Sequence, residues 1–353
     1  MSANRPPAQV ADILHCMVPI GRFGRTARPA GVRYRLRAMA VGVVALLSCG
    51  HGAGAQGYPE RPIKLVVPYA AGGATDAFAR LVGEHLGKAL GKPIVVDNRP
   101  GGATMTGTDA VAKAAPDGYT ILIAGSSMTN VFLVYKDKVP YQMSEFVAIG
   151  PIAKTPLVVE INPQLPAKSP AEFADYARAN PSKLNYATFG KGTLPHLACE
   201  MVNQQMGVKM VDVPYRGSAP ATTDLLGGQI QVFCDAVTTA MPLHEGGQTR
   251  ILGLMNEERI PFAKSIPTFR EQGYPDLIAS TTFGLLAPAK TPPEIVARLS
   301  AELARIVKEP EVVARIEMLG SVSVSGTSEE FDALIKRERD RWAKIAEGLQ
   351  LDE

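Results

Sequence analysis

Short apolar runs alternate with longer amphipathic stretches along most of the chain, and turn residues separate them. Apolar runs such as 63–69 and 119–125 are typical of buried strands. Apolar residues at three- and four-residue spacing, as in 75–90, are typical of helices with one buried face. Strands separated by helices of this length predict parallel βαβ units, so we expect an α/β fold.

The pattern occurs in two sets, which predicts two α/β domains. The first set consists of strands at 63–69, 94–100 and 119–125 and helices at 75–90 and 107–115. The second set consists of strands at 184–190, 209–215, 230–237 and 250–256 and helices at 169–180, 196–207 and 219–228.

Two extended apolar stretches, 155–163 and 283–290, connect the sets, and a helix with prolines near its N-terminus follows the second stretch. A chain that crosses to a second domain and returns makes a two-strand hinge, which suits the closure of a cleft on a ligand. The domains that we expect are 56–158 plus 286–353 for the first and 159–285 for the second.

The loop after the first strand has almost no side chains. In parallel α/β sheets ligands bind beyond the carboxyl ends of the strands, where the next helix presents unpaired N–H groups. Gly72 and Gly73 let the backbone approach a ligand closely. Either Thr75 or Asp76 can cap the helix, which leaves other amides free for an anion. The loop therefore predicts a carboxylate held by main chain.

Two further strand ends carry small or hydroxylated residues, and any one of them alone could be a simple tight turn. Together they predict a polar, uncharged pocket wall. The residues are Gly101, Gly102, Thr104, Thr106 and Gly107 after the second strand, and Ser126, Ser127 and Thr129 after the third.

The second set offers a facing edge. Gly190, Gly192 and Thr193 precede a helix that contains His196, and a strand ends at Asp235. The stretch from Tyr215 through Arg216 and Gly217 to Ser218 opens another helix. Structural roles remain open for three of these residues: a salt bridge for Arg216, a helix-start role for His196 and a cap for Asp235.

The N-terminal segment is basic, with seven arginines against one aspartate in residues 1–55. The remainder of the chain is close to neutral, so it lacks the excess of basic residues expected of a nucleic-acid-binding protein. An apolar run from Ala38 to Leu47 and the sequence Ala53-Gly54-Ala55 follow the arginines, which is the order of a secretory signal. The run is too short to span a bilayer. We expect export and cleavage after Ala55, with lipidation at Cys49 as an alternative.

Two cysteines remain after cleavage, Cys199 in a helix pattern and Cys234 in a strand pattern. They lack metal-ligand spacing, and we expect buried free thiols. No metal and no cofactor are expected. The chain contains no nucleophile elbow, no H-E-x-x-H and no phosphate-loop motif, so an enzyme is not expected.

Five stretches resemble, in order, the Bug family of periplasmic solute receptors, the binding subunits associated with tripartite tricarboxylate transporters. They are "YPERPIKLVVPYAAGGATDAFAR", "VDNRPGGATMTGTDAVAKAAPDGYT", "FGKGTLPHL", "VPYRGSAPATTDLLGGQI" and "FGLLAPAKTPPEIVARL". The resemblance implies a type II periplasmic-binding-protein fold. It also implies capture of a small carboxylate, which could be a di- or tricarboxylate, an acidic amino acid or an aromatic acid.

The resemblance also implies where the ligand binds. Together with the strand-end analysis, it gives as candidate ligand-binding residues Tyr69, Ala71, Gly72, Gly73, Thr75, Asp76, Gly101, Gly102, Ala103, Thr104, Thr106, Gly107, Ser126, Ser127, Gly190, Thr193, His196, Tyr215, Arg216, Gly217, Asp235 and Ala236. The sequence departs from the family at Ala103 and Thr104, where two glycines are usual, and at Thr282 and Phe283, near a usual tryptophan.

We therefore expect a monomeric periplasmic receptor whose partners are a small carboxylate and the membrane subunits of a transporter. A receptor that signals to a membrane sensor is the alternative, and the sequence does not separate the two.

Overall fold

The computed structural model describes residues 57–349 and 351, which belong to a compact unit that begins at Ala55. The expected signal segment and its cleavage site therefore lie outside the described residues. No helix within the described part of the chain is long and apolar enough to cross a bilayer.

The first half of the sheet consists of parallel strands joined by helices, as the sequence predicts. Strand β1 pairs with β2 on one side and with β3 on the other. Helix α2 buries Phe78, Val82 and Leu86, whose spacing places them on one face. The elements are β1 (Ile63–Val67), α2 (Ala74–Leu90), β2 (Ile94–Asn98), α3 (Met105–Ala112) and β3 (Thr120–Ala124). Short helices follow at α4 (Ser127–Asn130), α5 (Phe132–Tyr135), η1 (Lys136–Lys138) and η2 (Met143–Glu145).

The second half repeats the arrangement, with β5 parallel to both β6 and β7. Each element predicted for this half is present within a few residues of its expected bounds. The elements are α6 (Pro170–Ala179), β5 (Asn185–Thr188), α7 (Leu194–Met206), β6 (Val211–Pro214), α8 (Ser218–Leu226), β7 (Val232–Ala236), α9 (Val237–Glu245), β8 (Arg250–Leu254) and η3 (Pro261–Ala263).

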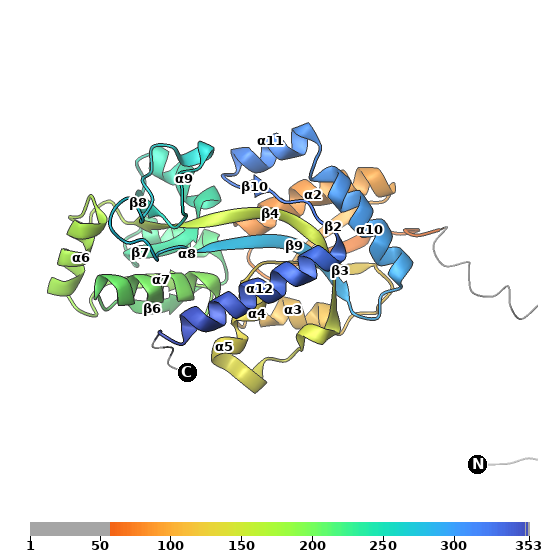
Figure 1. Cartoon of the computed structure of the whole chain (residues 1–353), viewed down its shortest axis with the longest axis horizontal. Helices are drawn as coiled ribbons and strands as arrows, with labels where there is room; N and C mark the ends of the chain where they lie inside the picture. The colour runs from red at the N-terminus through yellow and green to blue at the C-terminus, as the bar shows by residue number, and fades with distance from the viewer. Residues whose placement is uncertain (1–56, 350, 352–353) are drawn as a thin grey trace, which may run out of the picture. The chain divides into compact units, whose positions relative to one another are not determined.

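Two long antiparallel strands, β4 (Phe146–Ile161) and β9 (Ser280–Pro288), connect the halves (Figure 1). The first part of β4 pairs with β9, and its second part pairs with β7 and β8. The order of strands is therefore β2-β1-β3-β9-β4-β7-β5-β6. The stretches 155–163 and 283–290, predicted to be extended crossings, lie largely within these two strands.

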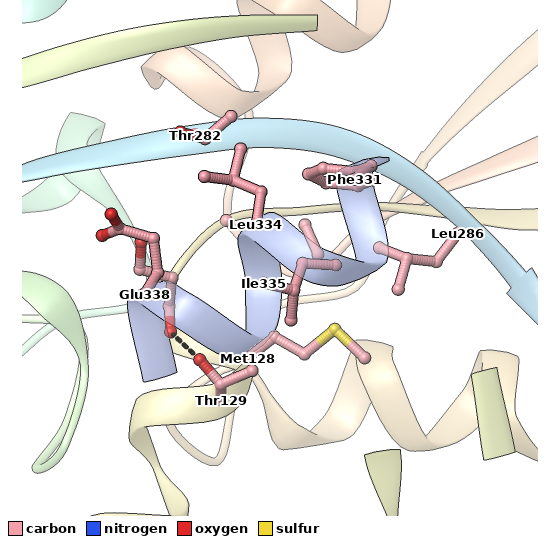
Figure 2. Close-up of a pocket in the computed structure, with 11 residues that line it drawn as sticks. Met128, Thr129, Thr282, Leu286, Phe331, Leu334, Ile335 and Glu338 are labelled. Carbon is pink, nitrogen blue, oxygen red and sulfur yellow. Dashed lines mark hydrogen bonds between the residues drawn. The ribbon is translucent and has the colours of Figure 1, made fainter. Parts of the chain in front are cut away.

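The chain returns to the first half through α10 (Pro293–Ile306), α11 (Pro310–Met318), β10 (Val322–Ser323) and α12 (Ser328–Ala346). Helix α12 begins with a capping box between Thr327 and Glu330. Figure 2 shows Phe331, Leu334 and Ile335 of α12 lying between Leu286 of β9 and the α4 segment, around a cavity of about 30 Å³. The apolar lining of this cavity is continuous with the packing of α12 on the sheet.

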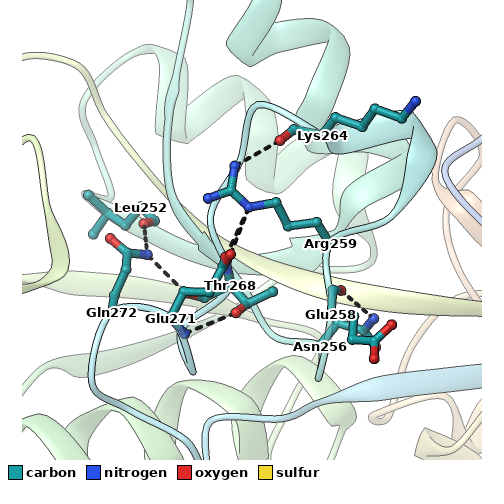
Figure 3. Close-up of polar contacts among 8 residues, drawn as sticks. All are labelled: Leu252, Asn256, Glu258, Arg259, Lys264, Thr268, Glu271 and Gln272. Carbon is teal, nitrogen blue, oxygen red and sulfur yellow. Dashed lines mark hydrogen bonds and ion pairs between the residues drawn. The ribbon is translucent and has the colours of Figure 1, made fainter.

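The segment between β8 and β9 contains only the short helix η3, and polar contacts link its remaining residues (Figure 3). Arg259 pairs with the carboxylate of Glu271 at 3.0 Å, which in turn accepts the Thr268 N–H at 2.7 Å. The Gln272 amide donates to the carbonyl of Leu252 on β8. These bonds fix the segment from which β9 starts.

Cys199 and Cys234 form a disulfide, with their Cα atoms 5.8 Å apart. The expectation of two free thiols is therefore wrong. Helix α7 packs on strand β7 and brings together two cysteines that are 35 residues apart in the sequence. Both are fully buried, so the bond is part of the core of the second half.

Candidate functional site

A small cavity lies between the two halves of the sheet. The loop before α2 and Ser127 form one wall, the second half forms the other, and the crossing strands contribute Leu157, Thr281 and Phe283. Its volume of about 40 Å³ corresponds to roughly three water molecules. The remaining lining residues are Tyr69, Gly73, Ala74, Thr75, Phe189, Leu194, Pro195, Ser218, Asp235 and Ala236.

The N-terminus of α2 faces this cavity without a side-chain cap. Gly73 occupies the N-cap position in an extended conformation, and no side chain bonds the first turn there. Within residues 57–349, no acceptor contacts the backbone N–H groups of Gly73, Ala74 or Thr75. These amides and the positive end of the helix dipole are available to an anion.

The prediction that Thr75 or Asp76 caps α2 is wrong, because Asp76 lies inside the first turn and bonds elsewhere. Its carboxylate accepts from the Gly72 N–H at 3.1 Å, from Arg80 at 2.9 and 3.0 Å and from Asn98 at 3.1 Å. Burial would raise the pKa of Asp76, but the hydrogen bonds from Arg80, Gly72 and Asn98 outweigh burial and lower it. Asp76 therefore fixes the loop and is not among the cavity-lining residues.

Tyr69 and Ser127 supply neutral hydroxyls on the first-half wall. Burial raises the pKa of Tyr69 to about 12, although a hydrogen bond with Ser127 lowers it in part. The phenol therefore keeps its proton at neutral pH. The Ser127 hydroxyl also accepts the Leu194 N–H at 3.1 Å, which links α4 to the start of α7.

Asp235 is the one charged side chain that lines the cavity among the described residues. It lies on β7 and is 2% exposed. It accepts from the Ser218 hydroxyl at 2.9 Å, from the Thr239 hydroxyl and from the Ala236 N–H. Burial raises the pKa of Asp235 to about 6 in spite of these three donors, so the carboxylate is charged at pH 7.

The two halves contact each other directly beside the cavity. The Ala70 N–H donates to the Arg216 carbonyl at 2.8 Å. A Cβ at Gly217 would lie 3.0 Å from the Ala70 nitrogen, and one at Gly190 would lie 2.8 Å from the Ala103 Cβ. Glycine at both positions therefore permits a closed cleft.

The structure brings together six of the candidate ligand-binding residues as cavity lining: Tyr69, Gly73, Thr75, Ser127, Asp235 and Ala236. The second loop, Gly101–Gly107, does not line the cavity. Ala103 and Thr104 there have φ values of 52° and 78°, a left-handed conformation that glycine adopts more easily. Roles in ligand binding for this loop remain predictions.

His196, Tyr215 and Arg216 also lie outside the cavity lining. His196 lines a separate groove with Lys191, and its Nδ1 accepts the Gly192 N–H at 3.3 Å. Burial lowers the pKa of His196 to about 4, so the ring is neutral at pH 7. The Tyr215 hydroxyl donates to Asp224. Their roles as ligand contacts also remain predictions.

The candidate list omits several lining residues, notably Ser218, Thr281 and Phe283. Ser218 follows Gly217 at a strand-to-helix turn, which is the same signal that identified the other loops. Thr281 and Phe283 alternate along β9 and so share one face, while Thr282 lies on the other face and lines the cavity of Figure 2. The alternation of side chains along this strand is the sequence pattern that could have identified Thr281 and Phe283.

Metal binding finds no support in the described residues, where no group of three or more His, Cys, Asp or Glu side chains could hold an ion. The cavity instead combines open amides, hydroxyls and one carboxylate. These groups suit the non-covalent binding of a small polar molecule.

Residues 78–351 match the family model described as "Tripartite tricarboxylate transporter family receptor". A protein from the tcbD-tcbE intergenic region of Pseudomonas sp. strain P51 is 36% identical over 82% of this chain and 86% of its own. The solved structure of the periplasmic binding protein BugD is 32% identical, with a TM-score of 0.80 over 84% of this chain and 99% of its own.

Two solved structures from Rhodopseudomonas palustris contain ligands. MatC with bound malate is 30% identical, with a TM-score of 0.78 over 82% of this chain and all of its own. A second protein, with adipate, is 32% identical, with a TM-score of 0.80 over 82% of this chain and 97% of its own.

Proposed function

Because the chain belongs to the tripartite tricarboxylate transporter receptor family, we propose that it is a periplasmic receptor that captures a small carboxylate for uptake. The family resemblance and the fold predicted from the sequence are both confirmed. The fold is the type II periplasmic-binding-protein fold, with two α/β domains joined by two strands and the cleft between them.

The observation that carries the proposal is the open N-terminus of α2 in the cleft. Three backbone amides there have no acceptor among the described residues, and the lining contains no lysine, arginine or histidine. Main-chain N–H groups at a helix N-terminus favour an anion that needs no cationic side chain. The malate and adipate in the two related structures are anions of this class.

The ligands that we propose are di- or tricarboxylates, acidic amino acids and aromatic acids. Delivery to the membrane subunits of a tripartite transporter, by a monomeric receptor, is the role that we favour. Signalling to a membrane sensor is the alternative, and the genes that neighbour the receptor gene distinguish a transporter from a sensor. A catalytic role is not proposed, because the family that the chain belongs to is one of receptors.

Export to the periplasm is proposed from the arginine-rich start, the short apolar run and the cleavage sequence that ends at Ala55. The disulfide between Cys199 and Cys234 supports this location, because such bonds persist in oxidising compartments.

The proposal is tested by thermal unfolding against a panel of ligands. Mono-, di- and tricarboxylates, neutral sugars and cationic amines are each added at increasing concentration. A ligand that binds only the folded protein stabilises it by about 2.7 kcal/mol at one hundred times its Kd. We expect a rise in melting temperature with at least one carboxylate and none with sugars or amines. A shift with a sugar and none with any carboxylate would contradict the proposed function.

A further inference from the structure

We propose that Asp235 makes the receptor select carboxylates that carry a hydrogen-bond donor beside the carboxylate, as 2-hydroxy and 2-amino acids do. This inference rests on the proposed function and adds the class of ligand to it. It is carried by the position of Asp235 in the cavity and by its distance from the open end of α2.

Asp235 has room for one more donor. An ionised carboxylate offers about four acceptor positions, and three are used by Ser218, Thr239 and the Ala236 N–H. Because Asp235 lines the cavity, we assign the remaining position to a donor of the ligand. A ligand hydroxyl or ammonium satisfies it, whereas a second carboxylate would be repelled.

The donor has to lie close to the carboxylate that binds the amides of α2. A Cβ built on Gly73 would be 3.4 Å from the Ser218 hydroxyl, and that hydroxyl is 2.9 Å from Asp235. One serine side chain therefore spans the distance between the anion site and the acidic residue. A ligand can contact both with a donor on an atom close to its carboxylate, and the 2-position is the nearest such atom.

The charge beside the ligand is that of Asp235 rather than of its acidic neighbour, Glu160. Both carboxylate oxygens of Glu160 are buried, and a hydrogen bond with Thr249 lowers the pKa of Glu160 only in part. Burial, with the nearby Asp235, raises the pKa of Glu160 to about 8. Of the two buried carboxyl groups, Glu160 therefore holds its proton more strongly, and the negative charge resides preferentially on Asp235.

Among the described residues, the hydrogen bonds of Asp235 include none with the other titratable side chains on the elements that pack against β7. They are Lys154 on β4, Tyr186 on β5, His196 and Glu200 on α7, Asp224 on α8, and His244 and Glu245 on α9. The pH dependence of the site is therefore expected to follow Asp235.

Calorimetric titration with matched pairs of acids at pH 7 tests the inference. The pairs are malate and succinate, lactate and propionate, and 2-hydroxyglutarate and glutarate, so that each pair differs only by a hydroxyl. In at least one pair, the parent protein should bind the hydroxy acid tenfold or more tightly than its partner. In Asp235→Asn this preference should fall below about threefold, because the charge that attracts the donor is gone.

Glu160→Gln is the matched control, since it makes the same chemical change on a side chain that does not line the cavity. It should leave the preference unchanged at pH 7. Lowering the pH to 5 should reduce the preference of the parent protein towards that of Asp235→Asn. The same pH series on Asp235→Asn measures how far protonation of the acids themselves changes binding. If that variant does not fold, the pH series on the parent protein tests the inference by itself.

Failure of the inference is distinguishable from failure of the proposed function. Equal or tighter binding of the unsubstituted acids by the parent protein at pH 7 would overturn the role of Asp235 and leave carboxylate capture intact. A preference that does not change between pH 7 and pH 5 would also overturn it. Absence of binding by these acids and by every carboxylate of the thermal-unfolding panel would refute the proposed function and this inference with it.

Discussion

Replacing Gly73 by valine tests whether main chain holds the ligand. Gly73 has φ −91° and ψ 175°, an extended conformation that valine adopts without strain. The added Cβ would lie 3.4 Å from the Ser218 hydroxyl, which is an ordinary contact. The methyl groups of valine would extend beyond that Cβ into the space beside the open amides, so the protein should fold while its anion site is obstructed.

The expected loss follows from the bonds that are obstructed. A hydrogen bond from an N–H to a charged group is worth about 1.5–3 kcal/mol, and about 1.4 kcal/mol corresponds to a tenfold change in Kd. Loss of one such bond should therefore weaken binding by about tenfold to a hundredfold. Gly73→Ala adds only the Cβ and should have a smaller effect, so the Kd should rise from the parent protein to Gly73→Ala and again to Gly73→Val.

The measurement is calorimetric titration with a carboxylate that binds the parent protein, and circular dichroism checks the fold. Lys191→Ala is the control, because Lys191 lines the separate groove that contains His196, and its affinity should stay within about threefold of the parent. A folded Gly73→Val protein that binds as tightly as the parent, beside a Lys191→Ala protein that does not bind, would show that a side-chain cation holds the ligand.

Two further predictions concern stability. The disulfide closes a loop with a sequence separation of 35, so its removal in a Cys199→Ala, Cys234→Ala protein should cost about 4 kcal/mol; an unchanged urea midpoint would contradict this. The pKa of Glu160 is raised from 4.5 to about 8, so between pH 4.5 and pH 8 the folded protein holds a proton that the unfolded protein has lost. The free energy of unfolding therefore falls as the pH rises through this range, by up to about 5 kcal/mol. Glu160→Gln should therefore raise the melting temperature more at pH 8 than at pH 5, and an equal rise at both would oppose the argument.

Most of the fold could be predicted from local sequence because its elements have local causes. Apolar runs end at glycine or proline, and Phe78, Val82 and Leu86 repeat at helical spacing, so β1 and α2 are found within two residues of their expected bounds. Helix α12 was not among the predicted elements. Its exposed face is highly charged, and its buried Phe331 and Trp342 are eleven residues apart, so the pattern alone did not reveal what it packs against.

The site depends on contacts between distant residues, and there local reasoning was less successful. Asp76 looked like a helix cap, but Arg80 and Asn98 bond its carboxylate, and the position of Asn98 depends on the pairing of β1 with β2. The disulfide depends on α7 packing against β7. The contact of Ala103 with Gly190 across the cleft also depends on residues distant in sequence, and the ligand role of the second loop stays a prediction. Each of these outcomes was decided by packing across elements.

The bond that joins Ala70 to Arg216 has a consequence for how such receptors diversify. It links a backbone N–H to a backbone carbonyl, so every residue except proline supplies the same donor at position 70. Mutations that reshape the cavity at Ser218 or Asp235 leave this bond in place. A related receptor with a different ligand can therefore keep the same contact between its two halves.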